Sequence, residues 1–142
     1  METKPLDAMA ILKLYELRGE ALMREARRWF FSSFSPASGR EIVALLLSGE
    51  RESAYYRMVS SHWESAAALV NHGGIDERLF LEANSEHLVV FARLQPFLAE
   101  VREAIGEPDY LLNLERLVMR VPNVERKLEG RRRLLARWTE KQ

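Results

Sequence analysis

One tight turn between two helical patterns constrains this chain more than any other part of it. The turn has the sequence Asn71-His72-Gly73-Gly74-Ile75-Asp76-Glu77. Paired glycines supply the left-handed backbone that closes a helix, and Asp76 is placed to cap the N–H groups of the next one. Ile75 and Phe80 stand at the two positions of a hydrophobic staple. The stretch therefore predicts a helix end, a turn and a new helix start.

Elsewhere the apolar residues recur every three or four positions, which is the period of an α-helix, and no segment alternates as a strand does. We therefore predict an all-α fold, with a single helical domain over residues 1–142 and about six or seven helices. Three helices are expected to be long and to form the centre, at about 5–34, 51–71 and 85–105. Shorter helices are expected to cover them, at about 40–47, 77–83, 109–120 and 122–138.

Two residues interrupt the long patterns. Gly19 falls inside the first, where it indicates either a bend or a close helix crossing. Pro96 falls inside the third, where it removes one backbone donor and predicts a kink.

Composition limits the classes of protein that this chain can represent. With 142 residues, 47% of them hydrophobic, the chain has enough apolar material for one core. The absence of cysteine excludes disulfides, thiolate metal ligands and cysteine nucleophiles, and it fits a cytoplasmic protein. The longest apolar run, 42–47, has six residues, whereas a membrane span needs about 20. We therefore expect a cytoplasmic protein without a membrane span.

The histidines are the first candidates for metal binding or catalysis. A helical metal site needs ligands at i and i+3 or i+4, and the sequence contains no HxxxH, HxxE or ExxH pair. No nucleophile motif and no phosphate-binding glycine loop is present either. We therefore predict no catalytic residues, no metal, no cofactor and no enzyme. An unrecognised enzyme with His62, Glu64 and His72 in a shared pocket remains an alternative.

Glu64 lies on a helix face lined by small residues, which allow another helix to approach closely. A carboxylate that is covered there needs a partner, because an unpaired buried charge is very costly. We predict that Glu64 is partly buried in a structural ion pair with an arginine, and Arg102 is favoured over Arg93 and Arg57. Plain solvent exposure is the alternative. The small residues of this face are Ser60, Ser61, Ala67 and Ala68.

Four large aromatic residues stand within six positions, at Trp29, Phe30, Phe31 and Phe34. Such residues point in several directions around a helix, so one inward face cannot take all of them. We predict that they form an interface, either with a second copy of the chain or with another protein. Our leading hypothesis is therefore a protein that acts through protein–protein contacts and self-associates. The alternative is that the helix at 40–47 folds over them.

The chain is neutral overall, but positions 120–142 carry a net charge of +5. The candidate anion contacts there are Arg131, Arg132 and Arg133. These guanidinium groups could contact phosphates, so an accessory protein for nucleic acid or an anionic surface is an alternative function. A solvated or ion-paired helix face is the simpler interpretation, because no recognition motif accompanies the cluster.

The segment from Tyr55 to Arg102 resembles a helical bacterial family catalogued as a domain of unknown function. The resemblance is carried by His62-Trp63-Glu64, by the turn at 71–76 and by Leu94-Gln95-Pro96-Phe97-Leu98 with the following Arg102. It implies a helical architecture in which Glu64 and Arg102 are matching polar positions that form a structural pair. Many members look membrane-anchored through an N-terminal helix, for which this sequence offers no apolar run of sufficient length. The resemblance lends no activity.

Overall fold

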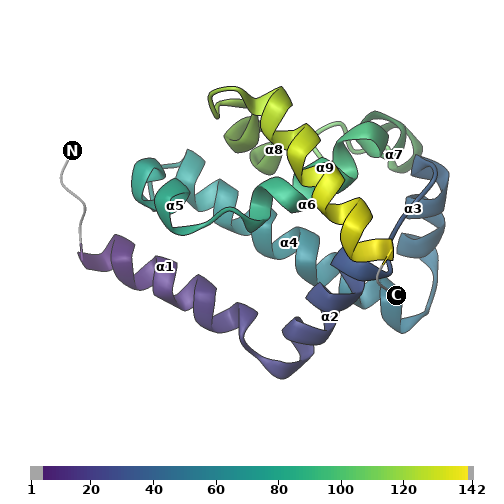
Figure 1. The fold of residues 1–142 in the computed structure, drawn as a ribbon, viewed down its shortest axis with the longest axis horizontal. Coiled ribbons are helices and arrows are strands. Elements are labelled where there is room, and N and C mark those ends of the chain that lie inside the picture. The colour runs from purple at the N-terminus through teal and green to yellow at the C-terminus, as the bar shows by residue number, and fades with distance from the viewer. Residues whose placement is uncertain (1–4, 141–142) are drawn as a thin grey trace.

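The structure is a computed structural model that describes residues 5–140, and over this range it contains nine α-helices, one 3₁₀ turn and no strand (Figure 1). The all-α prediction is therefore confirmed. Of the range predicted as one domain, residues 1–4 and 141–142 lie outside the described residues. The elements are α1 (Pro5–Arg18), α2 (Ala21–Ser32), α3 (Gly39–Leu47), α4 (Arg51–Asn71), α5 (Glu77–Ala83), α6 (Glu86–Leu94), η1 (Gln95–Phe97), α7 (Leu98–Ile105), α8 (Leu112–Met119) and α9 (Val124–Glu140).

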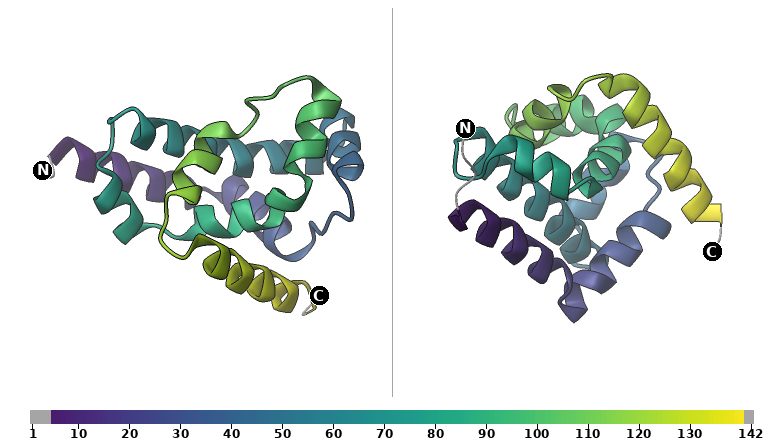
Figure 2. Two further views of the ribbon diagram at one scale, coloured as in Figure 1. Left: turned by 90° about the horizontal axis from the view of Figure 1, so that it is seen from above. Right: turned by 60° about the vertical axis from the view of Figure 1, so that its left-hand side comes forward.

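The described part of the chain has more helices than the six or seven predicted, because two of the long helices are broken. The first ends at Arg18, and the Gly19 N–H bonds to the carbonyl of Glu16 at 3.0 Å in a turn before α2 begins. The prediction of one helix over 5–34 was therefore wrong. Figure 2 shows the corner that α1 and α2 make. At 85–105 the chain forms α6, η1 and α7, because Pro96 lacks the N–H that would continue the α-helix.

The turn at 71–77 has the predicted form. Gly73 adopts a left-handed backbone with φ of +82°, and the Gly74 N–H bonds to the carbonyl of Leu69 at 2.7 Å. Asp76 caps α5, because its carboxylate accepts the N–H of Leu79 at 2.9 Å. The helix ends at 71 and 77 coincide with those predicted.

Helix α4 lies at the centre of the molecule, between α2 and α8 (Figure 1). Its largest buried side chains are Trp63 and Tyr56, and both are almost fully enclosed. Helix α9 packs on α6, and α3 packs on α7. The buried apolar side chains of all these helices belong to one cluster.

Helix α1 runs along the edge of the molecule (Figures 1 and 2). Its inner face buries Ile11 and Leu14. Near its N-terminus the carboxylate of Asp7 accepts the backbone N–H of Asp76 at 3.0 Å, which ties α1 to the start of α5. Within residues 5–140, no helix combines the length and the apolar character that crossing a bilayer requires.

Candidate functional site

Glu64 caps a helix instead of pairing with an arginine. One carboxylate oxygen accepts the N–H of Leu114 at 2.8 Å. The other accepts the backbone N–H and the side-chain amide of Asn113 at 3.3 and 3.1 Å. Both backbone N–H groups belong to the first turn of α8, which cannot satisfy them itself. A partly buried carboxylate is well stabilised there, because it also faces the positive end of the helix dipole.

Arg102 has other partners. It forms an ion pair with Glu115 at 3.1 Å, and its Nε donates to the carbonyl of Tyr110 at 2.8 Å. The prediction of an ion pair between Glu64 and Arg102 is therefore wrong. Glu64 is partly buried, as the small residues around it predicted, although Ser61 on the same face is exposed. The sequence did not indicate that a helix end covers the carboxylate.

The aromatic cluster at 29–34 is largely internal. Phe30 and Phe34 belong to the core, so the prediction of these two residues as an interface was wrong. Trp29 and Phe31 are partly buried: the first stacks on Phe34 with ring centres 5.0 Å apart, and the second meets the edge of Trp138 at 5.8 Å. The covering elements are α4 and α9, rather than the helix at 40–47.

The three consecutive arginines of α9 face different surroundings. Arg132 donates to the carbonyl of Ala92 at 3.1 Å and to the Gln95 side chain at 2.5 Å, so it ties α9 to α6. Arg133 is exposed. Arg131 lines a cleft that is described below. The three arginines predicted to contact one anion thus do not lie in one common site.

His62 and His72 lie in different surroundings. His62 borders a groove of about 380 Å³ between the α1–α2 corner and α4, which neither Glu64 nor His72 lines. Burial lowers the pKa of His62 to about 4, and nearby Arg18 adds to the effect. His72 is exposed at the end of α4. Among residues 5–140, no group of three or more His, Asp or Glu side chains is placed to hold a metal ion.

His87 is fully buried at the start of α6, where it packs against the rings of Trp63 and Phe80. Neither of its ring nitrogens has a hydrogen-bond partner. Burial lowers the pKa of His87 to about 4, and the positive charge of Arg131 lowers it further, so the imidazole is neutral near pH 7.

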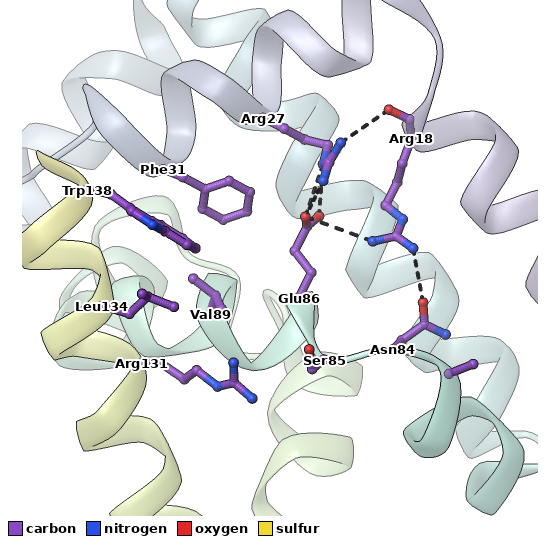
Figure 3. A pocket seen from close by; sticks show the side chains of 11 residues that line it. Arg18, Arg27, Phe31, Asn84, Ser85, Glu86, Val89, Arg131, Leu134 and Trp138 are labelled. Carbon is purple, nitrogen blue, oxygen red and sulfur yellow. Dashed lines mark hydrogen bonds and ion pairs between the residues drawn. The ribbon is translucent and has the colours of Figure 1, made fainter. Parts of the chain in front are cut away.

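A cluster of charges that the sequence analysis did not identify meets at Glu86, the first residue of α6 (Figure 3). Arg27 donates to both carboxylate oxygens, with its shortest bond at 2.6 Å from Nη2. The indole N–H of Trp63 donates to the same carboxylate at 3.1 Å, and Arg18 lies 3.9 Å from it. Residues from four helices are thus joined at one carboxylate.

Arg18 and Arg27 are also held by other contacts. The Arg18 guanidinium lies over the Trp63 ring at 5.2 Å and donates to the Asn84 side chain at 3.4 Å. Arg27 donates to the backbone carbonyl of Arg18 at 3.4 Å. This carbonyl lies in the last turn of α1 and has no hydrogen-bond partner within the helix. Arg27 and Glu86 are 59 positions apart, and no local motif signals that they meet.

Beside this cluster lies a cleft of about 460 Å³ that opens between α2, α6 and α9 (Figure 3). Three of the side chains that line it are cationic, Arg18, Arg27 and Arg131, and Glu86 is its one carboxylate, so the cleft carries a net charge of +2. Its opposite wall is apolar. The side chains of that wall are Phe31, Val89, Leu134 and Trp138.

The outer face of α1 is the second notable surface. Leu6, Met9, Leu12 and Tyr15 follow one another at spacings of three and are 65–73% exposed. Leu22, just beyond the corner with α2, is 57% exposed. The apolar side chains that the described structure leaves open to solvent are therefore concentrated here, rather than at the aromatic cluster.

The chain matches the model of a family described as a domain of unknown function, DUF4760, over residues 5–121. The match includes α1 and ends before α9. The resemblance inferred from residues 55–102 is confirmed, and it extends over a longer part of the chain. No curated protein and no solved structure matches the chain.

Proposed function

We propose that this chain, which belongs to the DUF4760 family, is a protein-contact module that self-associates through the outer face of α1. The observation that carries the proposal is the exposed apolar row of Leu6, Met9, Leu12 and Tyr15. The inner face of α1 already packs on its own domain, so this row is not needed for the core. A helix with only one covered face would normally carry polar residues on the other.

The size of this face supports a second copy of the chain as its occupant. The four side chains and Leu22 expose together on the order of 600 Å² of mostly apolar surface, which is at the upper end of the largest patches that monomers leave open. A standard interface buries about 800 Å² on each partner, and somewhat more than half of it is apolar. Two copies of α1 can therefore supply most of such an interface.

The charges on α1 also favour a two-fold arrangement. Lys13 and Glu16 form an ion pair of 3.6 Å on the exposed side, and both side chains are largely open to solvent. A two-fold axis pairs residue i with residue j and residue j with residue i. An axis that passes between Lys13 and Glu16 therefore places each beside the opposite charge of the other copy.

Light scattering over a range of concentrations tests the proposal. We expect the wild-type chain to reach the mass of a dimer, and Met9→Glu/Leu12→Glu to remain a monomer with unchanged helix content. The matched control is Leu47→Glu, which adds a charge at an exposed leucine of α3 and should still dimerise. A wild-type monomer at high micromolar concentration would overturn the proposal, as would a double variant that dimerises as wild type does.

A further inference from the structure

Arg131 brings a charge into the cleft that no side chain neutralises. Within residues 5–140 it makes no hydrogen bond and no ion pair. Figure 3 shows its guanidinium pointing toward the side of the cleft where Ser85 and Glu86 lie. A cation in a partly enclosed cleft attracts an anion more strongly than a cation in open solvent, because water screens it less.

Glu86 is not free to be that anion. Its carboxylate already accepts hydrogen bonds from Arg27 and Trp63 and lies in ion-pair distance of Arg18. Two of the three cations of the cleft thus share one carboxylate. In addition, the Nε of Arg18 is buried without a hydrogen-bond partner. The positive charge of the cleft is therefore unbalanced, and half of the net charge of +2 lies at Arg131.

The apolar wall restricts which anion fits. Leu134 stands one turn and Trp138 two turns further along α9 than Arg131. The ring of Phe31 contacts that of Trp138, and Val89 lies on the same side of the cleft (Figure 3). A ligand whose anionic group reaches Arg131 would lay the rest of its structure against these side chains. The volume of about 460 Å³ lies within the usual range of small-molecule sites.

We infer that this cleft binds a small organic carboxylate with an aromatic or aliphatic body. The carboxylate lies on the guanidinium of Arg131, whose planar fork matches the two oxygens of one carboxylate. The body packs against Trp138 and Leu134. A phosphate dianion fits less well, because it has no apolar body and would leave the apolar wall exposed to water.

Calorimetric titration with 3-phenylpropionate tests the inference, with phenylacetate and octanoate as carboxylates of other shapes. Neutral 3-phenylpropanamide and inorganic phosphate are the comparison ligands. We expect at least one carboxylate to bind saturably, and its affinity to fall with added salt. The neutral amide and phosphate should bind at least about tenfold more weakly, as expected for the loss of a charge-assisted hydrogen bond or of the apolar contact.

Two variants test whether the carboxylate binds at Arg131. Arg131→Gln should weaken carboxylate binding at least about tenfold without a change in melting temperature, because Arg131 has no partner to lose. Arg133→Gln removes an exposed arginine of the same helix and should bind as wild type does. The inference is overturned if no carboxylate of the series binds, if the amide binds as tightly as the acid, or if Arg131→Gln binds like wild type. Because these residues lie away from the outer face of α1, the result does not depend on self-association.

Discussion

The carboxylate of Glu64, in the middle of α4, accepts the backbone N–H of Leu114 at the start of α8, at a distance of 2.8 Å. The central helix thus holds a helix that lies 50 positions later in the chain by capping its N-terminus. The capped N–H groups, of Asn113 and Leu114, come shortly after Leu111 in the chain. Leu111 has a left-handed backbone with a φ of 57°, which costs a bulky residue about 1–2 kcal/mol. Glu64 therefore stabilises α8 where the backbone leading into it is strained.

Replacing Glu64 by alanine should lower the free energy of unfolding by about 1–2 kcal/mol, the usual cost of removing a helix cap. The loss stays below the 3–5 kcal/mol of a broken buried ion pair, because no arginine is left without its partner. Urea melts of Glu64→Ala, Arg102→Met and the double variant measure this. We expect the two effects to add within about 0.5 kcal/mol. A coupling of several kcal/mol would show that the two side chains interact directly after all.

Replacing Glu86 by glutamine should be more damaging. The carboxylate is 13% exposed and neutralises Arg18 and Arg27, which are 14% and 28% exposed, so its removal leaves two poorly solvated cations. We expect a loss of about 3 kcal/mol, the lower end of the range for breaking a buried pair. Glu82→Gln is the matched control, because it removes a carboxylate from an exposed pair with Arg78 and should cost at most about 1 kcal/mol. Equal losses in the two urea melts would contradict this assignment.

Burial of His87 predicts a loss of stability in acid. Its pKa is about 4 in the folded state against 6.5 for a free histidine, so the unfolded chain binds the proton more readily. Above about pH 6.5 His87 does not reduce the free energy of unfolding, because it is neutral in both states. As the pH falls toward 4, protonation of the unfolded chain lowers the free energy of unfolding, and the loss reaches about 3 kcal/mol.

Urea melts between pH 7 and pH 4 measure this effect in wild type and in His87→Leu. We expect His87→Leu to be at least as stable as wild type at pH 7, because neither ring nitrogen has a partner to lose, and to flatten the pH profile. Some slope should remain from His62, whose pKa is lowered in the same direction. His72→Leu is the exposed control. A profile that keeps its full slope in His87→Leu would contradict the assignment.

Local features of the fold could be predicted from sequence because their causes are local. Gly73 and Asp76 act on the backbone within a few residues of themselves, and the turn they predict is the turn observed. Whether a glycine inside a helical pattern bends the helix or ends it was harder to predict from the sequence. Gly19 was consistent with a bend, and only the packing of α1 and α2 against different neighbours shows that it ends the helix.

The contacts of the candidate site could not be predicted, because they join residues far apart in sequence. A carboxylate such as Glu64 can be satisfied by an arginine or by helix N–H groups, and periodicity does not distinguish the two. The meeting of Arg27 with Glu86 depends on where the tertiary fold places α2 relative to α6. For the same reason, the crowded aromatic residues at 29–34 were expected at the surface, although α4 and α9 cover most of them.

Isotope-filtered nuclear Overhauser spectroscopy tests self-association through α1 most directly. The sample is a mixture of ¹³C-labelled and unlabelled wild-type chains, so that only contacts between copies are observed. We predict contacts from the methyl groups of Met9 and Leu12 to protons of the unlabelled copy, and none from Leu47. The proposal would be contradicted if no contact between copies appears at high micromolar concentration, or if the contacts arise only outside α1.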